Sequence, residues 1–567
     1  MVRKVAKFML VLLLASLTLT ACGSDATTAT PVVPTTAPAQ ASPTTAPAAT
    51  TGNAATTAAA TTAASAATTA ASVATTVAAT TTSAAAPRGQ TLTIAVAAYP
   101  ASLDPTKNTP TEEPYMTLAY DSLLQFDADG NYQPLMATAW KWIGNDFKTL
   151  ELQLRPNVKF SDGSTFDAAA VKAWFDVQKK TNGSGSTGLD SAEATGPLTV
   201  QIHLVQGNPL LPSFLTRNWI TGDIACPAAA ANPALVSTAT CGTGPYMLDA
   251  KSTVTADTYT YVPNPNYWNP NAIHWNKIVL KVVANPQAAL DALKAGQVQL
   301  IAPADTAVID AGQTAGMKLA GVELNVQGLD FLDREGKIVP ALKDARVRQA
   351  LNYAIDKDAL SKVLGGGKGR PVSTQFLPGS DGYDATLDSY YNYDVAKAKQ
   401  LLTDAGFANG FELTILSAPF LGFDTLSQAV ASYWQAIGVK TTIDSKPSVA
   451  EFLTGLSSGK YGVAVAGLGA TTPTLITYNC CFKPGSAWNP SKTPVPDLQA
   501  IIEKLAATDA TQAGPVAKQV NKYITEQAWF VPVLATKLYF LYSPKISGVT
   551  PTATEASPNI LNIVPAQ

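Results

Sequence analysis

A run of small residues from Gly23 to about Arg88 limits where this 567-residue chain can fold. The run contains almost only Ala, Thr, Pro, Ser and Val, with no aromatic residue and very few charges. Such a segment cannot bury enough apolar surface to offset the entropy that the chain loses on folding. We therefore expect a disordered linker over residues 22–88 and a folded body that begins near residue 89.

A secretory signal precedes the linker. Arg3, Lys4 and Lys7 come before an apolar stretch too short to span a bilayer, and Leu-Thr-Ala then leads into Cys22. A cysteine after Leu-Thr-Ala resembles the cleavage site of bacterial lipoproteins, which are cut before the cysteine and acylated on it. The resemblance implies a signal peptide at 1–21 and a lipid anchor at Cys22, on the extracytoplasmic face of the cell membrane. The alternative is an ordinary signal peptide that ends near a cysteine.

The charge balance and the histidine count disfavour several functions. The formal net charge is −2, and removal of the three cations in residues 1–21 leaves about −5 (−2 − 3). Because no basic patch stands out, we expect no nucleic-acid partner. His203 and His274 are the only histidines and do not form a cluster. We therefore predict no metal site and no cofactor.

The sequence also lacks a catalytic motif. No serine occupies a Gly-x-Ser-x-Gly turn, and no pair of carboxylates is singled out by its spacing. The glycine run at 365–369, which contains Lys368, lacks the spacing and the Ser or Thr of a phosphate-binding loop. We predict that the protein is not an enzyme.

Four cysteines remain in the body. Cys226 and Cys241 enclose a short loop, and a disulfide between them would contribute roughly 3 kcal/mol through loop entropy. Cys480 and Cys481 are neighbours, with Cα atoms about 3.8 Å apart, closer than a relaxed disulfide prefers. This second pair forms a strained ring or stays reduced.

Local patterns predict several elements. The segment 91–96 alternates as a strand, and polar and apolar residues at helical spacing predict a helix over 111–124. Asp167 is placed to cap a helix over 168–179. Asp344 is placed to cap a helix that presents Val347, Ala350, Leu351, Ala354 and Ile355 on one face. Alternating helices and strands of this kind indicate an α/β or α+β class.

The body also carries a series of motifs in a specific order. They are LDPTKNT at 103–109, FSDGSTFDAAAVKAWF at 160–175, GTGPYML at 242–248, NPNYW at 264–268, LKDARVRQALNYAIDKDAL at 342–360 and WFVPVLATKLYFLYSPKISGV at 529–549. This order resembles the extracellular solute-binding proteins of family 5, the dipeptide, oligopeptide and nickel binders of ABC importers. The resemblance covers nearly everything from about residue 90 to residue 567.

The resemblance implies an α/β fold of two lobes, like periplasmic binding proteins of type II and their large peptide-binder subclass. Lobe 1 would comprise residues 89–305, with a meander insertion at about 125–195, and would be completed by 526–567. Lobe 2 would comprise residues 306–525. The ligand would bind in the cleft between the lobes, which close about a hinge near residues 305 and 525. The implied protein is a monomer that delivers its ligand to an ABC permease.

The resemblance also implies where the ligand binds. Family peptide binders often carry Gly-Trp-x-Ala-Asp, whose Asp pairs with the amino terminus of the peptide. In the matching run, which begins at Gly467, Leu468 replaces the aromatic residue and Thr471 replaces the Asp. If the alignment is shifted by a few residues, the nearest later acid is Asp497. The predicted ligand-binding residues are Tyr99, Thr109, Thr111, Gly467, Leu468, Gly469, Thr471, Thr472 and Trp488.

The sequence is compatible with three hypotheses about function. The family favours a peptide or a similar small solute, whereas hydroxyl groups in place of charges favour a neutral oligosaccharide or another non-peptide solute. A surface lipoprotein that senses a ligand without transport is the alternative of another class. Aromatic rings able to stack on a ligand in the cleft are Tyr99, Tyr115, Trp219, Phe376, Phe420, Tyr478 and Trp488.

Overall fold

A computed structural model describes most of the body. The described residues are 89–107, 112–182, 187–217, 219–486, 488–490, 492, 494–554 and 557–567. The predicted signal peptide, Cys22, the linker, Thr109 and Thr111 lie outside these ranges. Within them, no helix combines the length and the apolar character that a membrane crossing requires.

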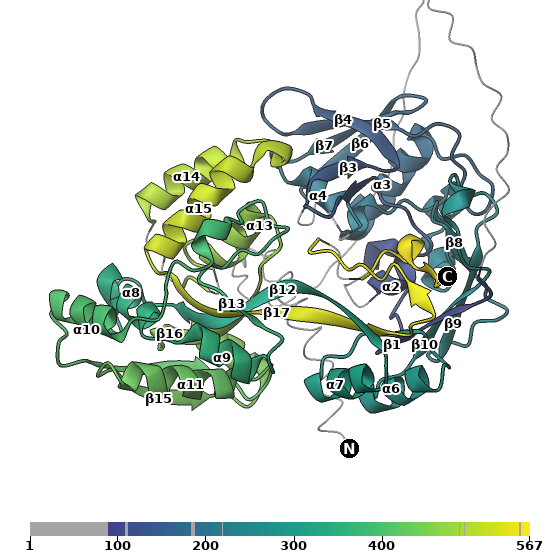
Figure 1. Cartoon of the computed structure of the whole chain (residues 1–567). Coiled ribbons are helices and arrows are strands. Elements are labelled where there is room, and N and C mark those ends of the chain that lie inside the picture. Colours follow the sequence, from purple (N-terminus) through teal and green to yellow (C-terminus); the bar gives the residue numbers. More distant parts are fainter. Residues whose placement is uncertain are drawn as a thin grey trace, which may run out of the picture. The chain divides into compact units, whose positions relative to one another are not determined.

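One mixed sheet of eleven strands runs through the body (Figure 1). Its strands follow the order β15-β14-β16-β12-β17-β11-β1-β10-β9-β8, and β13 pairs with β17 beside this path. Their bounds are β1 Leu92–Val96, β8 Tyr246–Leu248, β9 Thr258–Pro263, β10 Ile278–Val282, β11 Leu300–Ile301, β12 Lys318–Phe331, β13 Arg370–Pro371, β14 Glu412–Ser417, β15 Lys440–Ser445, β16 Val463–Gly469 and β17 Phe530–Tyr542. The strand expected at 91–96 is β1.

The two longest strands, β12 and β17, pair with each other and form a ribbon. They are antiparallel from Lys318 opposite Tyr542 to Asp330 opposite Phe530. The register shifts twice along β12, between Glu323 and Asn325 and between Gln327 and Gly328. A shift of this kind bends a strand and increases its local twist.

Two large hydrophobic cores lie along this ribbon. The lobe 2 core gathers buried residues mainly from 329–534, and the lobe 1 core gathers residues from 92–300 and 540–563. The strand β17 contributes Leu534 to the first core and Phe540 to the second. A smaller core on lobe 1 contains Leu541 and residues of α6 and α7. The ribbon is thus shared by both halves of the sheet.

Helices cover the lobe 2 half of the sheet. They are α8 Ala345–Tyr353, α9 Lys357–Leu364, α10 Val395–Asp404, α11 Phe423–Gln435, α12 Val449–Ser457, α13 Thr474–Thr477, α14 Pro496–Ala506 and α15 Gly514–Glu526. The expected cap is present, because Asp344 Oδ1 accepts a hydrogen bond from the backbone of Arg346 at 2.8 Å. The predicted apolar face does not belong to one helix. The helix α8 ends at Tyr353, so Ala354 and Ile355 follow it, and Asp356 then caps α9.

Lobe 1 carries the predicted meander as a separate four-stranded sheet, in the order β4-β5-β7-β6, and a hairpin of β2 and β3. The bounds are β2 Leu124–Phe126, β3 Tyr132–Pro134, β4 Ala137–Trp142, β5 Thr149–Leu154, β6 Leu189–Gly196 and β7 Thr199–Leu204. The helices of this lobe are α2 Glu113–Met116, α3 Ala168–Asn182, α4 Leu211–Phe214, α5 Pro227–Ala231, α6 Pro286–Lys294 and α7 Thr306–Thr314. The meander ends at Leu204, later than the expected limit near 195.

The prediction of a helix over 111–124 is confirmed only for Glu113–Met116. The helix α2 ends at Met116, and Leu124 begins the strand β2. The backbone amides of Leu123 and Leu124 donate to Gly222 O and Leu215 O, at 3.1 and 2.9 Å. These distant partners hold the backbone extended, so tertiary hydrogen bonds override the local helical spacing.

The cysteines of the body are of two kinds. Cys226 and Cys241 are bonded in a disulfide with a sequence separation of 15 residues. Cys480 and Cys481 are thiols in a single π-helical turn, Tyr478–Phe482, and Cys481 is buried. Of the two alternatives for this pair, the structure has the reduced one.

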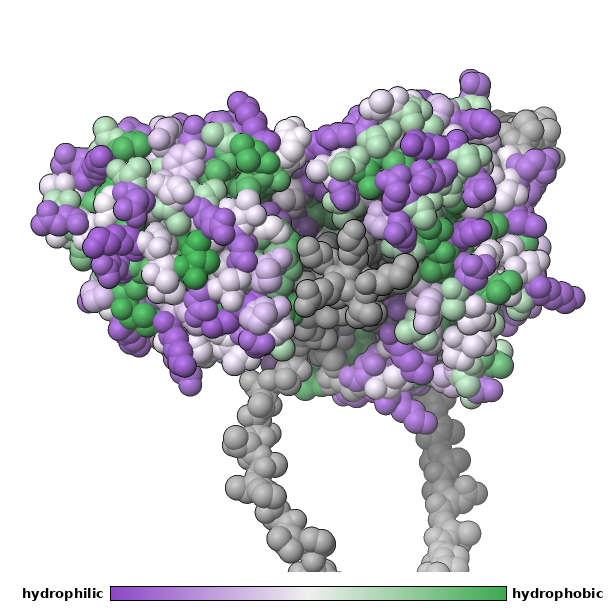
Figure 2. All heavy atoms as spheres, turned by 90° about the horizontal axis from the view of Figure 1, so that it is seen from below, coloured by the Kyte–Doolittle hydropathy of each residue, from purple (hydrophilic) through white to green (hydrophobic). Residues whose placement is uncertain are grey.

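The surface mixes polar and apolar side chains. Hydrophilic and hydrophobic residues are interspersed over both halves of the face drawn in Figure 2. Large apolar side chains that are exposed, such as Val363 and Val205, come from separate segments of the chain. Scattered apolar residues of this kind are normal for a protein surface in contact with water.

Candidate ligand-binding site

A cavity of about 4040 Å³ lies between the two cores and is lined by residues of both lobes and of the ribbon. Cavities that enclose a single drug-sized molecule occupy roughly 300 to 1,000 Å³. The ribbon contributes Leu324 and Asn325 from β12 and Thr536 from β17. The cavity therefore has room for an extended ligand and contacts the segment that joins the lobes.

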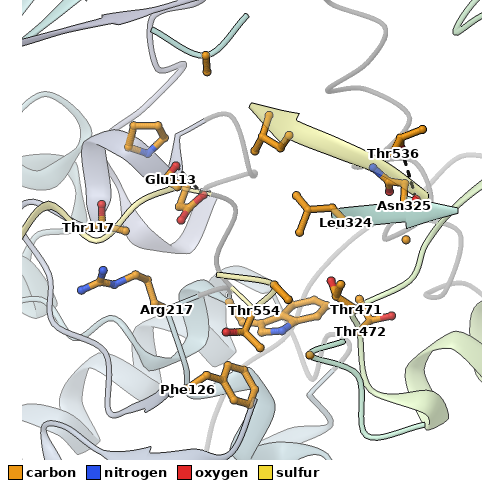
Figure 3. Close-up of a pocket in the computed structure, with 18 of the residues that line it drawn as sticks. Glu113, Thr117, Phe126, Arg217, Leu324, Asn325, Thr471, Thr472, Thr536 and Thr554 are labelled. Carbon is orange, nitrogen blue, oxygen red and sulfur yellow. Dashed lines mark hydrogen bonds between the residues drawn. The ribbon is translucent and has the colours of Figure 1, made fainter. Parts of the chain in front are cut away.

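The lobe 2 wall is rich in hydroxyl groups. Thr471 and Thr472 follow the end of β16 and face the cavity near Asn325 and Thr536 (Figure 3). The hydroxyl of Thr472 is 2.8 Å from that of Thr477 on α13, and its backbone carbonyl accepts a hydrogen bond from Ser380 at 2.9 Å. These bonds fix the segment after β16 against α13.

One carboxylate on this wall was not predicted from the sequence. Asp381 lines the cavity, and its Oδ1 accepts hydrogen bonds from the backbone amide and the hydroxyl of Thr474, both at 2.7 Å. Desolvation raises the pKa of Asp381, although these hydrogen bonds oppose the shift. Asp381 lies some ninety residues before Thr471, so no local spacing connects them. It holds the first turn of α13.

The lobe 1 wall also contains charged groups. Glu113 and Thr117, at the two ends of α2, and Arg217, after α4, lie across the cavity from Thr471 in Figure 3. The carboxylate of Glu113 accepts a hydrogen bond from Ser557 at 3.2 Å. Arg217 is 9% exposed. Glu113 and Arg217 therefore give the lobe 1 wall charges of both signs.

Two buried carboxyl groups lie close to Arg217, and one of them, Asp223, itself lines the cavity. Desolvation raises the pKa of Asp223 well above its usual value, and the guanidinium of Arg217 opposes the shift. Desolvation likewise raises the pKa of Asp121 to about 6, against the effects of a hydrogen bond from Trp268 and of the Arg217 charge. Arg217 thus interacts electrostatically with both carboxyl groups.

The nine predicted ligand-binding residues do not all line the cavity. Six of the nine line the cavity: Tyr99, Gly467, Leu468, Gly469, Thr471 and Thr472. Tyr99 is 53% exposed, whereas Leu468 is buried in the lobe 2 core. Trp488 does not line the cavity, contrary to expectation, because its ring is buried in the same core 6.3 Å from that of Phe452. Thr109 and Thr111 lie outside the described residues.

The aromatic residues predicted to stack on a ligand also divide into cavity residues and core residues. Trp219 and Phe420 line the cavity, whereas Tyr115, Phe376 and Tyr478 are buried in the two cores. Five cavity aromatics were not predicted: Phe126, Tyr132, Phe214, Tyr539 and Phe540. They belong to the β2–β3 hairpin, α4 and β17, whose positions at the cavity depend on how the lobes meet.

A metal site finds little support in the described part of the chain. Its one group of three potential ligands is Asp162 with Cys226 and Cys241. The two sulfur atoms of this group are bonded to each other and are therefore not available as thiolate ligands.

Comparisons with known proteins agree with this architecture. The family model described as "Bacterial extracellular solute-binding proteins, family 5 Middle" matches residues 131–489, more than half of the chain. The glutathione-binding protein GsiB of Escherichia coli K12 is 26% identical over 491 residues, covering 81% of this chain and 91% of that protein.

Solved structures show the same fold. HbpA2 from Haemophilus parasuis superposes with a TM-score of 0.74 at 21% identity, covering 84% of this chain and all of that one. The periplasmic binding protein DppA from Helicobacter pylori, in complex with the peptide STSA, has a TM-score of 0.61 at 20% identity and covers 85% of this chain and 99% of that one. The expected two-lobed α/β fold with a cleft between the lobes is confirmed.

Proposed function

Since the chain belongs to the bacterial extracellular solute-binding proteins of family 5, and is the solute-binding protein of an ABC importer, we propose that its ligand is a short peptide or peptide-like solute. The family membership confirms the resemblance noted in the sequence. The observation that carries the proposal is the cavity between the two cores, which the β12–β17 ribbon crosses.

The similar proteins support a ligand of this class. One is named as a glutathione-binding protein, and another was solved with a bound peptide. Glutathione is a tripeptide with an ammonium group and two carboxylates. Charges of both signs, Glu113 and Arg217, line the lobe 1 wall, and charge-assisted hydrogen bonds from such groups orient a zwitterion. We propose that the charged end of the ligand binds lobe 1.

A neutral oligosaccharide is the second candidate. Thr471, at the position where the family's carboxylate is expected, is uncharged, and the adjacent wall offers the hydroxyl of Thr472 and the carboxamide of Asn325. Hydroxyl groups bind a sugar well, and the ring of Trp219 in the cavity is suited to stacking on one. The uncharged side chains at positions 471 and 472, where the family's carboxylate is expected, are the observation that favours this candidate.

We propose that the lobes close about the ribbon. The family resemblance implies lobe limits at 305/306 and 525/526, but Val308 of α7 (Thr306–Thr314) packs in one core with Leu541, on the lobe 1 side. The irregular register at Glu323–Asn325, opposite Thr536, is a more favourable place for bending. Lobe 2 would then begin near residue 325 and end near residue 536.

We also propose that the body is tethered and delivers its ligand to a membrane permease. Cleavage before Cys22, acylation of its thiol and a flexible linker over 22–88 would hold a monomer near the outer face of the cell membrane. A sensor without transport would carry the same anchor, and a permease and an ATPase encoded beside this protein would distinguish the two. We propose no covalent chemistry, in keeping with the binding role of the family.

The test is identification of the ligand. The full chain is purified without refolding and examined by native mass spectrometry for a bound small molecule. Calorimetry then compares glutathione, trialanine and maltotriose as probes. Binding of glutathione or trialanine supports the peptide proposal, and binding of maltotriose alone would replace it with the saccharide candidate. If no small molecule co-purifies and no probe binds, the proposal of a peptide or saccharide ligand fails.

A further inference from the structure

An ion pair joins the two lobes beside the ribbon. Lys368 lies in the glycine-rich loop after α9, and its Nζ is 2.6 Å from Asp310 Oδ1 on α7. The loop belongs to the lobe 2 side, because it leads directly into β13, which pairs with Ala535 and Leu534 of β17. The helix α7 packs on the lobe 1 side, against Leu541. The pair therefore bridges two segments that closure of the lobes would move relative to each other.

The face of the ribbon on which this pair lies follows from the alternation of β17. Successive side chains of a strand point to opposite faces. Phe540 belongs to the large core of lobe 1, which also contains Tyr115 of α2, whereas Leu541 belongs to the small core with α6 and α7. Tyr539 shares the face of Leu541, and its hydroxyl donates to Lys368 O at 2.9 Å. The loop therefore lies on the α7 face.

The ribbon residues opposite Glu113 and Arg217 lie on the other face, and the cavity also reaches Lys537 and Tyr539 on the α7 face. Thr536 alternates with Lys537 and Tyr539, so it shares the face of Phe540, and Figure 3 places it opposite Glu113 and Arg217. On that side the lobes also touch, because Phe214 of α4 is part of the lobe 2 core. The ribbon is thus held from both sides: by contacts around the cavity and by the Lys368–Asp310 pair.

Glycine lets the loop make this contact. Gly366 and Gly367 have φ values of +56° and +74°, in the left-handed region that favours glycine. A Cβ at Gly366 would lie 3.5 Å from Thr306 Cγ2 on α7, so the loop passes directly beside that helix. Thr306 and Lys368 both border the cavity, so the gap between the loop and α7 is continuous with it.

A second set of charges fixes the same loop to the ribbon. Arg370 donates from Nε and Nη2 to the carboxylate of Glu323 on β12, at 2.8 to 3.1 Å, and from Nη1 to Asp388 at 2.6 Å. These groups are partly buried, and a bidentate guanidinium–carboxylate pair is rigid. The loop is therefore tied to the bend of the ribbon at Glu323 and, through β13, to lobe 2, whereas Asp310 belongs to a helix that packs on lobe 1.

We propose that the Lys368–Asp310 ion pair is a latch that resists closure of the cavity. Rotation of the lobes about the ribbon brings the cavity walls together and separates the loop from α7 on the other face, which stretches the pair. Loss of the pair then favours the closed form and tightens ligand binding. This inference rests on the proposed closure about the ribbon but not on the identity of the ligand.

The size of the effect follows from the exposure of the pair. The side chains of Lys368 and Asp310 are 20% and 62% exposed. Exposed ion pairs are weak and are screened by salt. We expect a shift of about two- to five-fold in the ratio of closed to open molecules when the pair is lost, and a smaller shift at high salt.

The experiment measures closure of the lobes without ligand. A negative result here can therefore be distinguished from an error in the proposed ligand class. Unnatural amino acids at the exposed positions Asn145 in lobe 1 and Lys399 in lobe 2 carry a dye pair for single-molecule energy transfer in the full chain. Asp310→Asn and Lys368→Met should each increase the population with short inter-dye distance. The exchanged pair, Asp310→Lys with Lys368→Asp, should restore the distribution of the parent protein.

A matched control lies within lobe 2. Lys440 and Glu412 form an exposed pair at 3.1 Å between two strands of the same lobe, so Lys440→Met should leave the distance distribution unchanged. The proposal is overturned if the two latch variants match the parent protein, if they shift toward longer distances, or if the exchanged pair fails to restore the parent distribution. Once a binding probe is identified, the latch variants should bind it two- to five-fold more tightly.

Discussion

The indole nitrogen of Trp268 donates a hydrogen bond to Asp121 Oδ2 at 2.8 Å. The guanidinium of Arg155 lies over the same indole ring, 4.2 Å from its centroid. Asp121 itself is only 2% exposed, and burial outweighs these favourable contacts, so its pKa rises to about 6. A buried carboxyl group behind the cavity wall thus titrates close to neutral pH.

This shift makes the stability of the protein depend on pH through Asp121. The pKa of the folded state lies above the unfolded value of about 4, so unfolding releases a proton between pH 4 and 6 and stability falls as pH rises through that window. Asp121→Asn removes this contribution. Relative to the parent protein, the variant should gain up to about 3 kcal/mol in unfolding free energy from pH 4 to pH 7. Urea unfolding at several pH values measures this difference, and a constant difference would contradict the assignment.

The disulfide should be worth a measurable part of the stability. Cys226 and Cys241 close a loop with a separation of 15 residues, so replacement of both by Ser should lower the unfolding free energy by about 3 kcal/mol. Urea midpoints are compared with and without reductant. Reductant should destabilise the parent protein by a similar amount and leave the double variant unchanged. Equal sensitivity of both proteins to reductant would assign the effect to other groups.

A buried ion pair in lobe 2 gives a third prediction. Arg334 donates to Asp330 Oδ1 at 3.1 Å and lies over the ring of Trp529, while desolvation raises the pKa of Asp330 to about 7 against the opposing charge of Arg334. Arg334→Met leaves the carboxylate unpaired and should cost about 3 kcal/mol or more at pH 8.

The cost should be smaller at pH 6, because an unpaired Asp330 takes up a proton and becomes neutral. The double variant Asp330→Asn with Arg334→Met is the matched control and should show much less pH dependence. Thermal unfolding at the two pH values tests the pair. An equal loss of stability at pH 6 and pH 8 in Arg334→Met would show that packing on Trp529, and not charge, dominates.

Thr471 offers a test of the lobe 2 wall. Thr471→Asp places a carboxylate in the cavity, where it should attract the ammonium group of a peptide and improve binding of trialanine about ten-fold over N-acetylated trialanine. Thr471→Asn is the neutral control and should not discriminate between the two probes. Calorimetry measures both affinities. If the Asp variant treats the two probes alike, Thr471 does not face the amino terminus of a peptide.

The anchor is tested separately from the body. Cys22→Ser removes the thiol that acylation requires, so the variant should leave the membrane fraction when cells are lysed without detergent. Labelling with a radioactive fatty acid should mark the parent protein and not the variant. Membrane fractionation of the variant together with the parent would contradict the lipid anchor.

Local sequence was sufficient wherever neighbours along the chain decide the structure. Asp167 and Asp344 cap their helices because a cap needs only a side chain two or three residues before the amide that it accepts from. The disulfide partners are also close in sequence. The predicted helix over 111–124 extends too far, because backbone partners more than ninety residues away hold Leu123 and Leu124 extended.

The residues at the cavity also divide into those that the sequence predicted and those that it did not. The position of Thr471 after the strand β16 was predictable, because the order of the family's motifs fixes the register of the whole body. Asp381 and Phe214 were not predictable, because their places at the cavity arise from loops that meet only when distant segments pack. The ring of Trp488 was expected at the ligand, yet it is buried beside Phe452; a sequence does not distinguish an aromatic ring in a wall from one in a core.

The sequence by itself determined the family, the alternation of helices and strands, and the segment from Gly23 to Arg88 as one that cannot build a core. These depend on composition, periodicity and the order of motifs along the chain, none of which requires contacts between distant residues to be known. Only the tertiary structure decided that β12 and β17 cross between the lobes and that Lys368 reaches Asp310. Such contacts join residues more than fifty positions apart, and the free energy that selects them comes from packing of the whole body.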